Sequence, residues 1–165
     1  MDQQFSHINA TGKLRMVDVS AKRMTRRSAV ARCLVVTSVN IADLEPRDDD
    51  IDPILCARIA GVSAAKRTSE LIPLCHLLNL NDVDVELLPH DRGIEVMATV
   101  TATQRTGVEM EALTASAFAA LSILASLQDV DPVAWIDDLV LLRKKGGKSG
   151  SWGRLVDEPN LGSAR

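Results

Sequence analysis

The stretch DVDVELLPHDRGIEVMATVTAT, residues 82–103, decides the fold. Its first six residues alternate an acidic residue with valine or leucine, the pattern of a strand with one buried face. Residues 89–93 contain proline, aspartate and glycine and predict a turn, and residues 94–103 predict a second strand. The stretch therefore predicts an antiparallel hairpin that lays one face on an apolar core.

A helix is predicted on each side of this hairpin. Asp52 is a helix N-cap candidate with proline at the next position, and apolar residues at spacings of four, three and three extend this helix to about Glu70. After the hairpin, Thr106 and Glu109 match a capping box at the start of an apolar helix over residues 106–127. Because this second helix is apolar on nearly all sides, we expect it to lie partly in a subunit interface.

Two further strands complete the predicted fold. Residues 30–37 are rich in β-branched residues, and residues 138–143 form a last apolar segment. The resulting order β-α-β-β-α-β predicts an α+β, ferredoxin-like fold with a four-stranded antiparallel sheet and its helices on one face. We expect an N-terminal arm over residues 1–28, a single domain over 29–150 and a polar C-terminal tail over 151–165.

Composition excludes several classes of protein. The 165 residues carry 19 Lys and Arg against 22 Asp and Glu, a net charge of −3, which argues against a general nucleic-acid-binding protein. Cys33, Cys56 and Cys75 lack CxxC spacing, so we expect neither a disulfide framework nor a metal site. We expect no cofactor. No signal-peptide pattern and no apolar run of membrane-spanning length is found in the sequence, which predicts a cytoplasmic protein without a membrane partner.

The basic residues are unevenly distributed. They gather in the first third of the chain and again after residue 142, and such clusters bind a polyanionic small molecule if they converge in space. A solvated basic surface is the alternative. The residues concerned are Lys13, Arg15, Lys22, Arg23, Arg26, Arg27, Arg32, Arg143, Lys144, Lys145 and Lys148.

Several sequence blocks carry a family resemblance. They are HIN at residues 7–9 with MVDVSAK at 16–22, ARIAGVSAAKRT at 57–68, LIPLCH at 71–76, and TGVEMEALTA at 106–115 with KKGGKSG at 144–150. In this order and at these spacings they resemble the cyclic pyranopterin monophosphate synthases, the MoaC family of molybdenum cofactor biosynthesis. The resemblance covers about residues 6–150.

The resemblance implies a lyase that forms a homo-hexamer, a trimer of dimers, with its active site at the dimer interface. The implied substrate is a nucleotide-derived small molecule, 3′,8-cyclo-7,8-dihydro-GTP, which loses pyrophosphate as a cyclic phosphate closes. The implied catalytic residues are Lys66 and Lys144. The implied substrate-binding residues are Leu74, Cys75, His76, Glu109, Met110, Glu111, Arg67 and Lys148.

Simple structural roles are the alternative for several of these residues. His76 follows the exit of a helix, where a histidine commonly packs or caps, and Glu109 is the last residue of the capping-box pattern. Glu111 is not needed by any cap. Lys66 and Arg67 could form the solvated end of the first helix, and the KxGGKSG run does not have the spacing of a phosphate-binding Walker sequence.

The chain departs from the family at three catalytic positions. The family's Asp-x-x-Lys on the long helix is replaced by Ala125 and Gln128, and a family lysine in the loop before the block at residues 57–68 is replaced by Asp50. The proline that usually follows the histidine is Leu77. Loss of one general acid or base typically lowers a rate by 10²- to 10⁴-fold, so the sequence favours an impaired synthase or a pseudoenzyme.

Three functions therefore stay open from the sequence. The first is the family function, with slow conversion of the substrate. The second is a non-catalytic partner or regulator of a competent paralogue. The third is an enzyme that acts on a different nucleotide-derived substrate.

Overall fold

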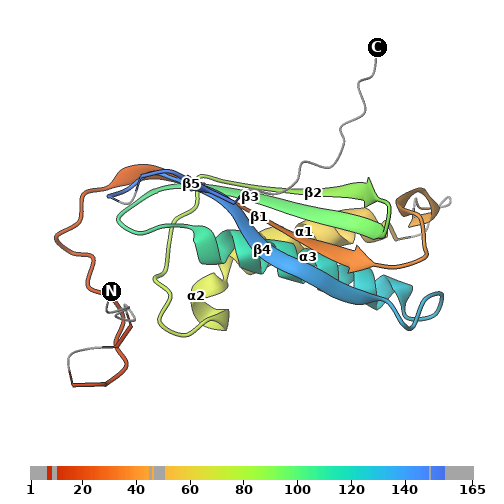
Figure 1. Cartoon of the computed structure of the whole chain (residues 1–165), viewed down its shortest axis with the longest axis horizontal. Helices are drawn as coiled ribbons and strands as arrows, with labels where there is room; N and C mark the ends of the chain where they lie inside the picture. Colours follow the sequence, from red (N-terminus) through yellow and green to blue (C-terminus); the bar gives the residue numbers. More distant parts are fainter. Residues whose placement is uncertain (1–6, 9–10, 45, 47–50, 149, 155–165) are drawn as a thin grey trace, which may run out of the picture.

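Figure 1 shows the fold in a computed structural model that describes residues 7–8, 11–44, 46, 51–148 and 150–154. Within these residues the chain forms one open sheet, three α-helices and one short 3-10 helix. The strands are β1 (Thr25–Val36), β2 (Asp82–His90), β3 (Gly93–Gln104), β4 (Trp135–Lys145) and β5 (Trp152–Gly153). The helices are η1 (Ile41–Leu44), α1 (Pro53–Lys66), α2 (Thr68–Leu71) and α3 (Glu109–Leu127).

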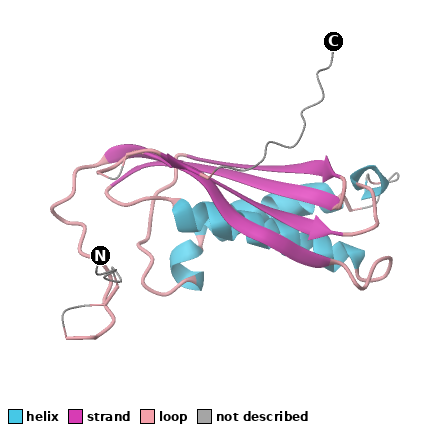
Figure 2. Ribbon diagram, in the orientation of Figure 1, coloured by secondary structure: helices cyan, strands magenta, loops and turns pink. Residues whose placement is uncertain are grey.

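The sheet confirms the ferredoxin-like α+β prediction. Its strand order is β2-β3-β1-β4-β5, every neighbouring pair is antiparallel, and the helices cover one face (Figure 2). The predicted hairpin is β2 paired with β3, from Asp82 opposite Thr101 to His90 opposite Gly93. The sheet has one strand more than the four predicted, because the two-residue β5 pairs with the end of β4.

The first strand is longer than its apolar pattern indicates. β1 begins at Thr25, five residues before the predicted start, and it runs through residues that were assigned to the N-terminal arm. Thr25 pairs with Gln104 of β3, and Ser28 pairs with both Thr101 of β3 and Lys145 of β4. Backbone pairing with β3, joined by β4 at Ser28, therefore holds this polar part of the strand, which side-chain periodicity alone cannot reveal.

The first predicted helix is divided in two. The Asp52 side chain accepts hydrogen bonds from the N–H groups of Ile54 and Leu55, which confirms the N-cap. The helical backbone is then interrupted at Arg67, with φ −110° and ψ 12°, and resumes as α2. The helical segment reaches residue 71, close to the predicted end, but it is not a single helix.

The capping-box prediction at α3 is wrong. The helix begins at Glu109, its N-cap residue is Val108, and no side chain caps it. The Glu109 carboxylate instead accepts a hydrogen bond from Lys144 Nζ at 2.9 Å. A charged partner on β4 has thus replaced the local backbone partner that the pattern predicts.

Helix α3 is the core helix of the domain. It is long and apolar enough to cross a membrane by length and composition alone, so the expectation that no apolar run reaches that length is wrong. However, half of its 18-residue apolar stretch is buried inside the chain. The helix packs against β1, β3, β4 and α1. Its opposite face leaves Phe118 38% and Leu121 49% exposed.

Close packing of α1 on α3 depends on a glycine. A Cβ at Gly61 would lie 2.9 Å from the backbone oxygen of Ala115 and 3.1 Å from a methyl group of Val85. A backbone oxygen in a core helix cannot move aside cheaply, so a side chain at this position must push the two helices apart.

We expect Gly61→Val to lower the free energy of unfolding by about 2 kcal/mol, the cost of overpacking a close helix contact. Urea unfolding followed by circular dichroism measures this loss. Ser63→Val is the matched control, because it adds the same side chain to the exposed face of the same helix. Equal stability of the two variants would contradict the close contact between α1 and α3.

Candidate functional site

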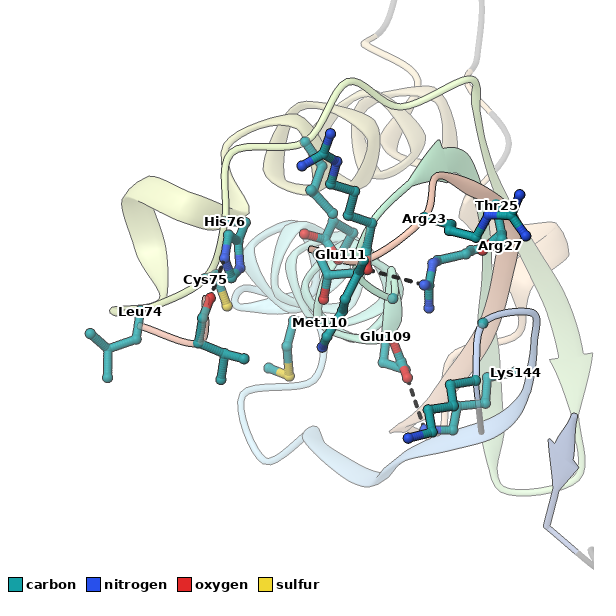
Figure 3. A pocket seen from close by; sticks show the side chains of 18 of the residues that line it. Arg23, Thr25, Arg27, Leu74, Cys75, His76, Glu109, Met110, Glu111 and Lys144 are labelled. Carbon is teal, nitrogen blue, oxygen red and sulfur yellow. Dashed lines mark hydrogen bonds and ion pairs between the residues drawn. The ribbon is translucent and has the colours of Figure 1, made fainter. Parts of the chain in front are cut away.

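A cavity of about 1290 Å³ opens at the end of the sheet where the N-terminus of α3 lies (Figure 3). Four segments that are distant in sequence line it. They are the N-terminal segment and the start of β1 (residues 17–27), the loop after α2 (74–78), the β3–α3 connection with the first turn of α3 (105–111), and the end of β4 with its following loop (144–148). His7 also contributes to the lining.

The cavity brings together most of the residues that the sequence blocks pointed to. Eight of them lie on its surface: Leu74, Cys75, His76, Glu109, Met110, Glu111, Lys144 and Lys148. Lys144 was predicted to follow the last strand, which was expected to end at Arg143, and to lead into a glycine-rich loop. It lies instead inside β4, paired with Ala29 of β1 and with Trp152 of β5, so its backbone position is fixed on both sides.

The basic clusters converge on the same cavity. Lys22, Arg23 and Arg27 from the first third of the chain line it together with Lys144 and Lys148, which agrees with the polyanion prediction rather than with a dispersed basic surface. Sequence analysis did not assign Arg105 or Thr106 to the site, although both lie in its lining. Thr106 begins the sequence block at residues 106–115 and Arg105 directly precedes it, which was the signal that could have identified them.

Backbone carbonyl groups hold two of these arginines in place. Arg27 donates from Nε to Gln104 O at 3.0 Å and from a terminal nitrogen to Arg105 O at 3.1 Å. Arg105 in turn donates to the carbonyl oxygen of Ser20. Gly147, with φ +76°, leaves room for the Arg27 guanidinium, because a Cβ at this residue would overlap it. The cationic surface is therefore organised before any ligand binds.

His76 links the loop after α2 to the N-terminal segment. Its Nε2 lies 2.9 Å from the carbonyl oxygen of Val17. A carbonyl oxygen can only accept, so Nε2 carries a proton and donates it in this bond. In the neutral ring Nδ1 is then the acceptor, and the contact fixes both the tautomer and the orientation of the ring.

Two carboxylates of the first turn of α3 have different surroundings. Glu109 is part-buried and paired with Lys144, whereas Glu111 is 4% exposed. Burial raises the pKa of Glu111 to about 7, its own backbone N–H opposes this rise, and the negative charge of Glu109 adds to it. Burial also raises the pKa of the Cys75 thiol, and Glu111 contributes to that rise. Glu111 can therefore give or take a proton near neutral pH.

Comparison with known proteins shows the family of this chain. A sequence profile of the MoaC family matches residues 16–147. The chain belongs to the MoaC family. A protein named cyclic pyranopterin monophosphate synthase 2 from Mycobacterium tuberculosis strain H37Rv is 46% identical over 156 residues, 92% of each chain. The cyclic pyranopterin monophosphate synthase of Chloroflexus aggregans is 48% identical over 158 residues, 92% of this chain and 94% of the relative. That of Streptomyces avermitilis is 46% identical over 154 residues, 92% and 90% of the two chains.

Other predicted residues of this MoaC-family chain lie outside the cavity. Lys66 is exposed at the end of α1, and Arg67 pairs with Glu70 at 2.8 Å. Ala125 and Gln128 are also exposed. Ala125 lies fourteen residues after Glu111 on the same helix, which is about 21 Å along the axis at 1.5 Å per residue. Asp50 lies outside the described residues.

The Glu111 carboxyl should make the stability of this MoaC-family protein depend on pH. Because its folded pKa of about 7 lies above the ordinary 4.5, the neutral acid favours the folded chain. That contribution is complete below pH 4.5 and is lost as the pH rises through 7, on the order of 3 kcal/mol in total at 1.36 kcal/mol per pKa unit.

Glu111→Gln mimics the neutral acid at every pH. We expect it to match the wild type in urea unfolding near pH 4.5 and to be more stable than the wild type at pH 8. Glu86→Gln, which changes an exposed carboxylate on β2, is the control and should show no such divergence. A constant difference between Glu111→Gln and the wild type at both pH values would contradict the raised pKa.

Proposed function

We propose that this chain acts in molybdenum cofactor biosynthesis by binding 3′,8-cyclo-7,8-dihydro-GTP in the cavity. We further propose that it converts this nucleotide to cyclic pyranopterin monophosphate and pyrophosphate far more slowly than a complete synthase. Family membership supports the pathway, and the names of the relatives support the substrate.

The observation that carries the proposal is the charge of the cavity. Six lysine and arginine side chains line it against two glutamates. Such an excess of cations suits a triphosphate, which needs charge-assisted hydrogen bonds to be held tightly. The cations are Lys22, Arg23, Arg27, Arg105, Lys144 and Lys148.

Proton transfer is the second requirement of this reaction. Opening the imidazole ring and expelling pyrophosphate both need groups that exchange protons at neutral pH. Glu111, with a pKa of about 7, is suited to this role, and the His76 ring is held in one orientation by Val17. We therefore assign proton transfer to Glu111, and substrate contact to His76.

The reduced rate follows from the three replaced positions. Ala125 cannot exchange a proton, Gln128 carries no charge, and Asp50 would repel a triphosphate where the family has a lysine. Each such loss lowers a rate by about 10²- to 10⁴-fold, and groups that act as a unit are lost together.

The family assembly, a hexamer built as a trimer of dimers, is part of the proposal. Exposed apolar side chains on the helical layer support it, namely Leu55, Ile59, Phe118 and Leu121. A composite site at a subunit interface would also reconcile the cavity with Lys66, Ala125 and Gln128, which lie outside it. The thiols Cys33, Cys56 and Cys75 are free, which supports a reducing, cytoplasmic compartment.

We expect purified protein at micromolar concentration to be an even-numbered oligomer, with six chains as the expected mass in multi-angle light scattering. Leu121→Glu would place a charge in the apolar face of α3 and should yield smaller species. Asp84→Lys, on the exposed side of β2, is the control and should keep the wild-type mass. A monodisperse wild-type monomer would rule out the proposed assembly.

Restoring the lost residues tests the catalytic part of the proposal. Ala125→Asp, Gln128→Lys and Asp50→Lys together should give measurable formation of cyclic pyranopterin monophosphate, whereas each single change should give little, because the groups act as a unit. The product is quantified by chromatography after incubation with the cyclised dihydro-GTP. Wild-type turnover at the rate of a complete synthase would overturn the assignment of reduced activity.

Binding should be measured beside turnover. If the triple variant binds the nucleotide and stays inactive, a non-catalytic partner of a competent synthase becomes the better reading. If neither protein binds the nucleotide, an enzyme that acts on a different nucleotide-derived substrate becomes the better interpretation.

A further inference from the structure

Lys144 differs from the other cations of the cavity. Among the lysine and arginine side chains of the cavity that the structure describes, only that of Lys144 forms an ion pair with a carboxylate. Its Nζ lies 2.9 Å from Glu109 Oε1. The two side chains remain 33% and 29% exposed, so solvent and ligands can reach the pair. The ammonium group of Lys144, whose backbone is paired on both sides, is therefore already neutralised by Glu109.

The chain leaves a place for the Glu109 carboxylate. It lies directly over Gly107, where a Cβ would overlap its oxygen atoms. Glu109 is also the first residue of α3, where the helix dipole favours a negative charge and no side chain caps the N–H groups. Glycine, helix terminus and lysine together hold this carboxylate inside a cavity whose charged lining is mostly cationic.

We propose that Glu109 is an internal counter-ion, a built-in anion that a polyphosphate ligand must displace from Lys144 before that lysine can bind a phosphate group. This inference rests on the proposed function, because it takes the polyphosphate to be the ligand of this cavity. It makes Glu109 a positioning residue that sets polyphosphate affinity through Lys144.

A direct consequence concerns the sign of a mutational effect. If the Glu109 carboxylate helped to bind the ligand, its removal would weaken binding. An internal counter-ion competes with the ligand, so the apparent dissociation constant equals the intrinsic one divided by the fraction of chains in which Lys144 is free. Removing the charge of Glu109 should therefore tighten binding of a polyphosphate.

Isothermal titration calorimetry with inorganic pyrophosphate tests this sign. Glu109→Gln keeps the shape of the side chain and should bind pyrophosphate about threefold to tenfold more tightly than the wild type at low salt, the range expected for release of a partly exposed ion pair. The gain should shrink as ionic strength rises, because salt screens both the pair and the ligand.

Two matched variants separate this effect from simpler ones. Asp137→Asn removes a carboxylate that pairs with Arg92 outside the cavity, and it should leave the dissociation constant unchanged. In a Lys144→Gln background, Glu109→Gln should change the dissociation constant for pyrophosphate by about twofold or less, because the competition requires the lysine. Thermal unfolding of each variant checks that the domain remains folded.

The outcomes distinguish the inference from the proposed function. Tighter binding by Glu109→Gln with no change in Asp137→Asn supports the counter-ion role. Detectable binding by Glu109→Gln alone would be the strongest form of this result. Equal or weaker binding by Glu109→Gln, with a wild type that binds, overturns the inference and leaves the proposed function standing. Failure of all these folded proteins to bind pyrophosphate overturns both.

Discussion

The cavity depends on the antiparallel pairing of β1 with β3 and β4 at one end of the sheet. Thr25 lies opposite the last residue of β3, and Ala29 lies opposite Lys144 near the end of β4. Three strand ends that are about 40 to 120 residues apart in sequence therefore meet, with the start of β1 one strand spacing from the end of β3 and from the end of β4. Each carries basic residues or leads into a segment that does, and α3 begins directly beneath them. Sheet register thus brings Arg27, Arg105 and Lys144 together, and the segments that flank the strands add Lys22, Arg23 and Lys148.

Local patterns in the sequence were sufficient for much of this fold. The alternation over residues 82–87 identified β2, and the Asp52 N-cap identified the start of α1, because both signals depend on neighbours a few residues away. The start of β1 could not be found in this way, since residues 25–28 are held by backbone pairing with β3, by pairing of Ser28 with β4, and by hydrogen bonds from the Arg27 side chain to residues distant in sequence. The capping box failed for a similar reason: Lys144, 35 residues away, competes successfully for the Glu109 carboxylate.

The candidate site shows the same division. Leu74 to His76 and Glu109 to Glu111 are contiguous motifs and could be selected from the sequence. Arg105 belongs to no motif of its own, and its role follows from a hydrogen bond to Ser20 that only the folded chain contains. Ala125 and Gln128 are exposed and distant from the cavity along α3, so their substitution leaves the core packing untouched. The MoaC fold and the cationic cavity therefore do not depend on the residue types at these two positions.

The short strand β5 also affects colloidal behaviour. An uncovered strand at the border of a sheet is a template for pairing with other chains, which leads to aggregation. β5 occupies this border at Arg143 and Lys144, and Asp137 and Asp138 place charges further along β4, where the register shift bends the strand. The two residues of β5 are therefore a form of protection against fibrillar self-association. The same few backbone bonds that hold Lys144 beside the cavity keep the basic end of β4 from recruiting a foreign strand.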